Sequence, residues 1–332
     1  MKTKVLTRIL MCVLALSGLA SCDHKELCYD HSHTVTIRLA FDWQNAPEAT
    51  PEGMCAYFYS QEDGSVQRFD FSDILDGEIE ISAGTYQLIC YNNDTEGVLF
   101  SGTGSFGTHM GYTREGSIFE SIYGSGVTSS RVDDSGERVV ICPDMMWGCS
   151  SVEMEIAESG VSYYCVPVQD GAQERVESAE QVITLYPAEL ICTYTYEIRN
   201  VNNLKYATQM CGTLSSMAPS LLFATEELGS ECVTIPFASV SDGVSRITGG
   251  FYTFGHNTAN TDAHKFLLYV WITDGSKYYY TFDVTEQIEN AEDRRHVHII
   301  IDGVDFPQPI TNGNGFTPAV DEWGNVDEDI IM

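Results

Sequence analysis

Cys22 is the residue whose neighbours most clearly predict a chemical modification. It closes the run Leu19-Ala20-Ser21-Cys22, which matches the box that bacterial lipoprotein signal peptidase cuts between Ser21 and Cys22. Three basic residues and then an apolar stretch over residues 9–20 come before Cys22. The stretch is too short to span a membrane. The sequence therefore predicts a signal peptide over residues 1–21 and a thioether-linked diacylglycerol on Cys22, usually with an amide-linked acyl chain such as palmitate. The alternative is an ordinary secretory signal in which Cys22 is incidental.

The net charge of the chain limits the partners that it can bind through electrostatic attraction. The formal charge is -31 at pH 7, and removal of residues 1–21 takes away Lys2, Lys4 and Arg8 and no acidic residue, so the charge becomes -34. Such a surface repels nucleic-acid phosphates and anionic lipid headgroups. We therefore expect no nucleic-acid partner, and we expect the acyl chains on Cys22 to hold the mature protein on a membrane.

The sequence gives little support for a catalytic site or a cofactor site. The patterns G-x-S-x-G and H-E-x-x-H are absent. Gly102, Gly104 and Gly107 satisfy G-x-G-x-x-G, but no helix pattern follows them, so they indicate a loop and not a dinucleotide site. Residues 92–97 resemble the start of an EF-hand loop, but its twelfth position is Thr103 where a glutamate would bind calcium. We predict no catalytic residue and no cofactor.

Two groups of histidines could in principle bind a metal ion. Residues 24–33 hold three histidines and Cys28, but their spacing fits no closed tetrahedral site, so a polar tether is the simpler interpretation. His296 and His298 share one face of a predicted strand and would need a third, converging ligand. A solvent-facing pair needs nothing more, and we predict no metal site.

The cysteines favour buried free thiols over a disulfide framework. Of the eleven cysteines, Cys12 leaves with the signal peptide and Cys22 is lipidated, and the nine that remain are odd in number and irregularly spaced. Several lie inside strand-like runs, such as Cys90 and Cys192, where a thiol packs as a small hydrophobic group. One or two disulfide bridges remain an open alternative.

Almost every patterned segment alternates polar and apolar residues with the period of a β-strand. The segments are rich in Thr, Tyr, Val, Ile and Phe and end in Gly, Asn, Asp or Pro. The predicted strands are 33–43, 54–60, 78–82, 85–92, 138–142, 182–198, 265–273, 277–284 and 296–302. Asp274-Gly275 supplies a tight hairpin turn between two of them. Short helices are expected at 285–291 and 203–210, and a long irregular excursion at 101–126.

Several of these segments resemble a known superfamily of surface proteins. The run ISAGTYQLICYNND (81–94) is similar to a characteristic strand of the transthyretin-like sandwiches in Bacteroides-type fimbrillins. The opening of the mature chain, CPDMMWG (142–148), EIRNVNNL with GTLSSMAPS (197–220), and the DGSKYYYTFDVT hairpin together resemble an uncharacterised lipoprotein family. That family is related to FimB-type and Mfa-like fimbrillins, which are anchor or minor subunits of fimbriae.

The resemblance implies an all-β protein with two tandem transthyretin-like, Ig-like β-sandwiches. The expected organisation is a signal peptide (1–21), a tether (22–32), an N-terminal sandwich (33–200), a C-terminal sandwich (201–306) and a C-terminal tail or closing strand (307–332). It also implies attachment to the outer membrane through Cys22, on the cell surface, with fimbrial subunits or other surface proteins as partners. Arg38 lies inside the first predicted strand and would be a poor site for the cleavage that matures shaft subunits. An anchor, accessory subunit or adhesin without enzymatic activity is therefore expected.

The C-terminal tail and the aromatic residues leave two questions of function open. Trp323, Val326, Ile330 and Ile331 resemble the closing strand of the superfamily, which could pair with the sheet edge of a partner or seal the chain's own second sandwich. The aromatic residues could form a sugar-stacking face, which would suit a glycan-binding surface lipoprotein of a polysaccharide-uptake system. Strand alternation would bury about half of these rings. The aromatic residues considered for this face are Phe251, Tyr252, Phe254, Trp271, Tyr278, Tyr279 and Tyr280.

Overall fold

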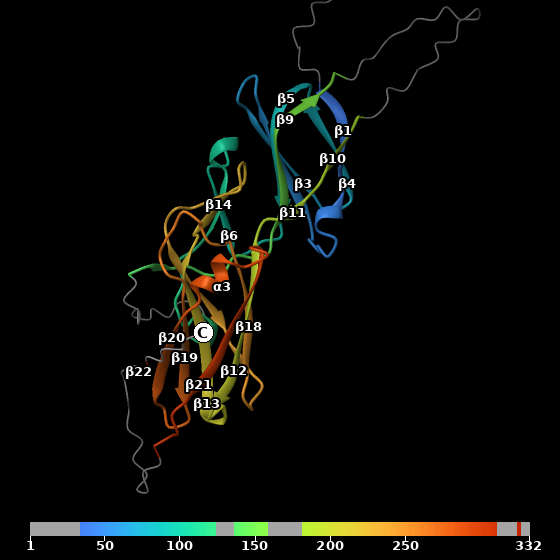
Figure 1. Ribbon diagram of the computed structural model, residues 1–332. Coiled ribbons are helices and arrows are strands. Elements are labelled where there is room, and N and C mark those ends of the chain that lie inside the picture. The colour runs from blue at the N-terminus through green and yellow to red at the C-terminus, as the bar shows by residue number, and fades with distance from the viewer. Residues whose placement is uncertain (1–33, 124–135, 159–180, 311–323, 327–332) are drawn as a thin grey trace, which may run out of the picture. The chain divides into compact units, whose positions relative to one another are not determined.

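The chain folds almost entirely into β-strands, as its sequence predicts (Figure 1). The computed structural model describes residues 34–123, 136–158, 181–310 and 324–326. The helical segments in these ranges are the helices α2 (Glu120–Tyr123) and α3 (Thr285–Glu289) and the 3-10 turns η1 (Trp43–Asn45), η2 (Phe106–Thr108) and η3 (Leu204–Tyr206). Within the same ranges, no helix has the length and apolar character needed to cross a bilayer.

The first β-sandwich is built from a three-stranded and a five-stranded sheet. The smaller sheet has the order β10 (Gln181–Leu185), β1 (Thr34–Phe41), β4 (Asp76–Ser82). The larger sheet has the order β11 (Ala188–Glu189), β9 (Trp147–Ile156), β5 (Gly84–Asn92), β2 (Met54–Ser60), β3 (Val66–Phe71). Alternate residues of the strands point inward, so Ile37, Leu39, Phe58, Ile81 and Leu88 share one buried cluster. The two sheets are therefore held together by a common apolar core.

The second β-sandwich is built from a four-stranded and a six-stranded sheet. The smaller sheet has the order β17 (Val240–Ser241), β18 (Ile247–Thr253), β12 (Cys192–Asn202), β21 (His296–Asp305). The larger sheet has the order β22 (Gly324–Val326), β20 (Lys277–Asp283), β19 (Lys265–Ile272), β13 (Ala207–Met217), β16 (Val233–Ala238), β8 (Arg138–Val139). Aromatic rings fill the space between the two sheets, and the rings of Phe237 and Phe251 stack with centroids 4.1 Å apart. The predicted Asp274-Gly275 turn joins β19 to β20, with Gly275 at a φ of 86° that favours glycine.

A fifth sheet covers the reverse face of β2 and β5. Its order is β15 (Glu227–Leu228), β14 (Ser220–Leu222), β7 (Met110–Thr113), β6 (Val98–Ser101). Residues from this region pack with Tyr59 and Tyr91 in a third apolar cluster that includes Phe223. Because β7 pairs with both β6 and β14, the chain between residues 98 and 113 is tied to a segment more than 100 residues later.

Three local predictions need correction. The 182–198 segment is not one strand but three, β10, β11 and β12, because Pro187 lacks a backbone donor and the chain bends at Ile191. The 203–210 segment forms only the 3-10 turn η3 before β13 begins at Ala207, which pairs with β19. The 101–126 excursion is not wholly irregular, since it contains η2, β7 and α2, and Phe119 packs on the rings of Tyr269 and Trp271.

Strand pairing crosses the predicted domain boundary at residue 200. β12, which begins before that residue, pairs with β18 and β21, and β8 pairs with β16. The boundary itself remains a prediction. Arg38 lies within β1, where its backbone pairs with β10, and its side chain makes an ion pair of 2.5 Å with Asp76. That Arg38 is a poor cleavage site stays a prediction.

Candidate functional site

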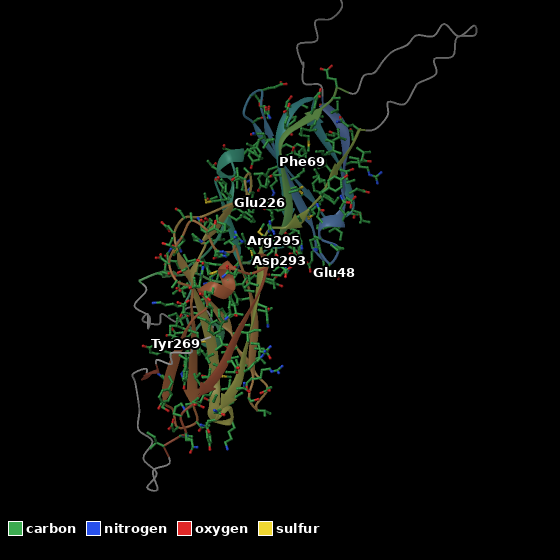
Figure 2. All side chains as sticks on the ribbon, in the orientation of Figure 1. Glu48, Phe69, Glu226, Tyr269, Asp293 and Arg295 are labelled. Carbon is green, nitrogen blue, oxygen red and sulfur yellow. The ribbon has the colours of Figure 1, made fainter. Side chains whose placement is uncertain are left out.

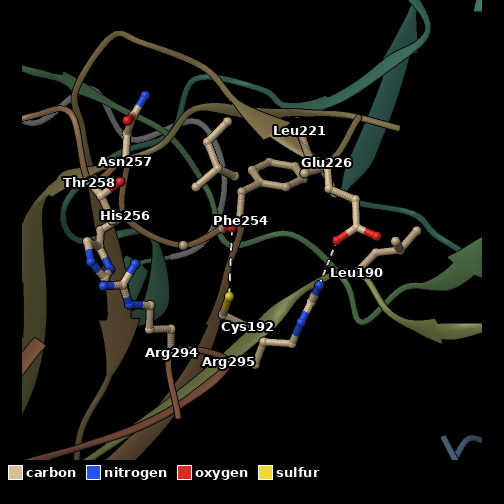
Figure 3. A pocket seen from close by; sticks show the side chains of 12 residues that line it. Leu190, Cys192, Leu221, Glu226, Phe254, His256, Asn257, Thr258, Arg294 and Arg295 are labelled. Carbon is tan, nitrogen blue, oxygen red and sulfur yellow. Dashed lines mark hydrogen bonds and ion pairs between the residues drawn. The ribbon is translucent and has the colours of Figure 1, made fainter. Parts of the chain in front are cut away.

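A pocket of about 360 Å³ lies beside the start of β12 and β21 (Figure 3). Loops from three parts of the chain contribute to it: residues 255–258 after β18, Glu226 between β14 and β15, and Arg294 with Arg295 just before β21. The volume is within the range of small-molecule binding sites. Leu221, Leu228 and Phe254 form an apolar wall, and the loop residues supply polar groups.

The loop after β18 is shaped by a glycine and an asparagine. Gly255 has a φ of 111°, and a side chain there would meet the Sγ atom of Cys192 at 3.2 Å, so glycine is needed at this position. The side-chain oxygen of Asn257 accepts a hydrogen bond of 2.9 Å from the amide of Ala259. These features hold His256, Asn257 and Thr258 at the rim of the pocket.

Arg295 lies in the wall of the pocket, where its side chain has a structural role. Its Nη2 atom makes an ion pair of 2.7 Å with Glu226, and its Nη1 atom donates a hydrogen bond to the backbone carbonyl of Glu189. The carbonyl of Arg295 accepts a hydrogen bond of 2.7 Å from the amide of Thr193. Its charge is therefore already matched by Glu226, and the residue ties the β14–β15 turn to the start of β12.

Arg294 is an exposed cation without a carboxylate partner in the part of the chain that the structure describes. Its guanidinium lies beside the imidazole of His256 in Figure 3. His256 is buried, and its Nδ1 atom lies 3.2 Å from the hydroxyl of Tyr194. Burial lowers the pKa of His256, and His264 and Arg294 add to this effect, so the imidazole stays neutral at pH 7. The net positive charge of this corner therefore comes from Arg294.

The chemistry of the pocket suits binding better than catalysis. An unpaired guanidinium can make two parallel hydrogen bonds to a carboxylate, and the neighbouring amide and hydroxyl can bind hydroxyl groups. The thiol of Cys192 lies 3.8 Å from the carbonyl of Phe254, and burial raises the pKa of this thiol to about 11. Cys192 is therefore a protonated thiol at neutral pH and a poor nucleophile. The pocket fits a small ligand that carries both an anionic group and an apolar face.

Most of the residues that the sequence predicts as functional lie outside the described ranges. These are Ser21, Cys22, Trp323, Ile330 and Ile331. Val326 lies in β22, which pairs in parallel with β20, so that Val326 is opposite Tyr280. The histidines and Cys28 of residues 24–33 also lie outside the described ranges.

The two histidines of β21 contact polar groups and do not converge on one point. His296 lies 3.1 Å from a carboxylate oxygen of Glu189 and 2.9 Å from one of Asp293, and His298 lies 2.8 Å from the hydroxyl of Thr195. In the described ranges, no three His, Cys, Asp or Glu side chains are arranged to hold a metal ion. Asn92 and Asp94, which resembled an EF-hand start, instead tie loops together, since Asn92 accepts a hydrogen bond from the amide of Trp147.

The aromatic residues considered as a sugar-stacking face are mostly in the core. Phe251, Phe254, Trp271 and Tyr280 are buried, and Tyr278 and Tyr279 are partly buried. Only Tyr252 of this set is exposed. The alternation of the strands predicts that about half of these rings are buried. The rings do not form an open platform.

Sequence reasoning missed the pocket because its residues are far apart in the chain. The one local signal was the pair Arg294-Arg295 in a chain that has 17 basic and 48 acidic residues. Two adjacent arginines in such a chain indicate a local anion site or a local ion pair. In the structure Arg295 makes an ion pair with Glu226, and Arg294 lines the pocket. The labels of Glu226, Arg295 and Asp293 in Figure 2 locate this corner of the molecule.

The fold and sequence of this chain are similar to those of several proteins of the Bacteroides group. A curated protein of Bacteroides ovatus, "Putative fimbrium anchoring subunit Fim4B", is 26% identical over 152 residues, which are 45% of this chain and 41% of that protein. The match therefore spans about two fifths of the relative's length. This match confirms the predicted relation to fimbrillin-type anchor proteins.

Two solved structures resemble this chain at low sequence identity. The crystal structure of "a putative adhesin" from Bacteroides ovatus has a TM-score of 0.58 and 19% identity, and the alignment covers 89% of this chain and 99% of that one. The fimbrial anchor protein Mfa2 of Porphyromonas gingivalis has a TM-score of 0.46 and 14% identity, over 80% of this chain and 90% of that one. The first of these likenesses confirms the predicted β-sandwich fold.

The family model described as "Domain of unknown function (DUF5119)" matches residues 21–238, which are well over half of the sequence. The chain belongs to this family.

Proposed function

We propose that this protein is a cell-surface lipoprotein that works as an anchor, accessory subunit or adhesin of a fimbrium, without enzymatic activity. The observation that carries the proposal is the sequence match to the curated fimbrium anchoring subunit. The tandem β-sandwiches are consistent with it, because this architecture offers edge strands such as β21 to neighbouring subunits.

The proposal includes attachment to the outer membrane through Cys22. The run Leu19-Ala20-Ser21-Cys22 supports cleavage before Cys22, and the acyl chains then added would give stable anchoring. The acidic surface is consistent with this attachment, because a mature chain of charge -34 is repelled by anionic headgroups and would be held by its acyl chains.

The edges of the second sandwich are the surfaces that we propose for contact with other subunits. One edge of the six-stranded sheet is the short strand β22, which pairs in parallel with residues Tyr278–Tyr280 of β20. Among the described strands, β21 forms an edge of the four-stranded sheet. The side chain of Gln287 donates to the carbonyl of Ile300 and accepts from its amide, and so closes part of that edge.

The role of the tail (316–332) as a partner strand remains a proposal, and the pairing of β22 with β20 supports the alternative that it seals its own sheet. Deletion of residues 316–332 separates the two. If the tail is a donor strand, affinity capture of surface proteins by the deleted chain is lost, while the protein still unfolds cooperatively. Unchanged capture would overturn the donor role.

Retention of fimbriae on the cell tests the anchor role. A strain that lacks this protein is complemented with the wild type or with Cys22→Ala, and fimbriae are counted on cells and in the medium by electron microscopy. We expect fimbriae on cells with the wild type, and shed fimbriae with Cys22→Ala, because the variant lacks its lipid. Equal retention in all strains would contradict the anchor role.

A second candidate function, glycan binding, is favoured by one observation. Arg294, which has no carboxylate partner among the described residues, lies at a pocket with an apolar wall, and this arrangement suits a sugar acid such as a hexuronate. We predict that Arg294→Gln weakens binding of an oligouronate by about tenfold, because it removes a charge-assisted hydrogen bond. Isothermal titration calorimetry measures the change, and Lys265→Gln is a control that removes an exposed cation outside the pocket. Equal affinities for wild type and Arg294→Gln, or no binding by either, would exclude this role for the pocket.

A further inference from the structure

Cys90 and Cys149 lie directly opposite each other on neighbouring strands. The antiparallel pairing of β5 with β9 places Cys90 in register with Cys149. Both residues pack in the same apolar cluster of the first sandwich, so both side chains point to the same face of the sheet. The two thiols are within hydrogen-bond contact of each other.

The spacing of these strands suits a disulfide bond. Directly opposite residues in an antiparallel pair have Cα atoms about 4.5–5.5 Å apart, and disulfides join Cα atoms about 4.4–6.8 Å apart. Cys55, on the next strand, belongs to the cluster on the other face of the sheet, so its thiol points away from Cys90. In the structure described here all three cysteines are free thiols.

We propose that Cys90 and Cys149 form a reversible cross-strand disulfide by exchange with a disulfide-bearing oxidant. The oxidant can be a small-molecule disulfide or the disulfide of an oxidoreductase. The bridge would join β5 to β9, which are central and adjacent in the five-stranded sheet. It would fix their register, which otherwise depends on backbone hydrogen bonds and packing.

The exposure of the two residues sets the order of the exchange. Cys149 is partly exposed, whereas Cys90 is 1% exposed. The thiolate of Cys149 attacks one sulfur of the oxidant, so that a mixed disulfide forms and the first thiolate leaves. The thiolate of Cys90 then attacks the sulfur of Cys149, and the second thiolate leaves. The two cysteine protons pass to the solvent or to the leaving thiolates, and the oxidant is reduced by two electrons.

The contact between the thiols supports the same order. The hydrogen bond with Cys90 lowers the pKa of Cys149, because the bond stabilises the Cys149 thiolate. The same hydrogen bond, together with burial, raises the pKa of Cys90. Cys149 is thus suited to attack first and Cys90 to resolve the mixed disulfide.

Mass spectrometry of the oxidised protein tests the proposal. The purified, reduced protein is equilibrated with mixtures of reduced and oxidised glutathione, alkylated, and digested without reductant. We expect a linked pair of peptides that contains Cys90 and Cys149, lighter than the separate peptides by two hydrogens, and its disappearance after treatment with dithiothreitol. We also expect oxidation to raise the thermal unfolding midpoint, because the bridge constrains the unfolded chain.

Two serine variants complete the test. Cys149→Ser should abolish the linked peptide and the rise in the unfolding midpoint. Cys232→Ser replaces another partly exposed cysteine, one that contacts Asn260 and Asp262 instead of a second thiol, and should change neither. The proposal is overturned if the wild type under oxidising glutathione yields no Cys90–Cys149 peptide, or only a glutathione adduct on Cys149. The wild-type experiment is decisive even if Cys149→Ser fails to fold.

Discussion

His109 lies at the centre of a buried group of aromatic residues. Its side chain is fully buried, with Nδ1 2.5 Å from the hydroxyl of Tyr59 and Nε2 3.0 Å from the hydroxyl of Tyr91. The ring of Phe223 packs against it at an interplanar angle of 85°. A neutral imidazole has one donor and one acceptor nitrogen, so one tyrosine donates and the other accepts. His109 therefore joins the first sandwich, through β2 and β5, to the fifth sheet.

We predict that His109 makes the protein sensitive to mild acid. Burial lowers the pKa of His109 to about 4, from 6.5, and nearby Arg68 adds to the effect. Because the unfolded chain takes up this proton more readily, the stabilisation from the neutral ring is complete above pH 6.5 and declines as the pH falls towards 4. The loss reaches about 3 kcal/mol at its limit. Urea denaturation between pH 7.5 and 4.5 measures it.

Two glutamine variants serve as controls for this effect. His109→Gln should be less stable than the wild type at pH 7.5 but should lose less stability between pH 6.5 and 4.5. His298→Gln replaces an exposed histidine outside this buried group and is the matched control for the substitution itself. A wild-type free energy of unfolding that is constant from pH 7.5 to 4.5 would show that His109 does not remain neutral in the folded protein.

At the scale of single elements, the side chain of Gln287 on α3 covers part of the edge strand β21. Its amide group makes two hydrogen bonds of 2.9 and 2.8 Å with the backbone of Ile300, in the manner of a neighbouring strand. Edge strands with free backbone groups tend to pair with other chains. A single side chain thus takes the place of part of a strand.

We predict that Gln287→Leu increases self-association of the protein. The variant leaves the amide and carbonyl of Ile300 without these partners and adds apolar surface at the edge. Light scattering coupled to gel filtration, over a range of concentrations, measures the change in mass. Gln209→Leu is the matched control, because Gln209 is exposed on β13 and makes no such contact with an edge strand. If neither variant differs in mass from the wild type, Gln287 does not protect the edge.

The strands that could be predicted from the sequence are those whose apolar residues alternate cleanly. β2, β5, β19 and β20 are rich in aromatic and branched residues and lie within a residue or two of their predicted bounds. β9 was missed because Ser150, Val152 and Glu153 are exposed and its alternation is weak. β16 was missed because Pro236 interrupts the pattern, although that residue pairs with Thr213 in the sheet.

The candidate site was much less predictable than the strands. The proposed lipid site at Cys22 rests on a contiguous motif that is visible in the sequence itself. The pocket depends on tertiary structure, since it joins Glu226, residues 255–258 and Arg294, and no local spacing relates them. The pairing of Cys90 with Cys149 depends on the register of β5 and β9, which strand propensity does not fix.

At the scale of the whole molecule, the acidic charge governs how the protein meets other charged surfaces. With a net charge of -31, long-range repulsion should oppose contact with anionic glycans or membranes. We predict that attachment of the protein to an immobilised anionic polysaccharide is weak at 0.01 M salt and increases towards 0.15 M. The screening length falls from about 30 Å to about 8 Å over this range. Surface plasmon resonance at several salt concentrations measures the trend, and binding that falls with salt would mean that local attraction at Arg294 dominates.

The central claim is that the protein is a lipid-anchored partner of fimbrial subunits. In-cell crosslinking followed by affinity purification and mass spectrometry, on wild type and Cys22→Ala, tests it most directly. We predict that the wild type carries acyl chains on an N-terminal Cys22 and captures fimbrillin-like subunits, and that Cys22→Ala is lost from the outer-membrane fraction. An unlipidated N-terminus would contradict the claim, and so would capture of polysaccharide-importer components without fimbrial subunits.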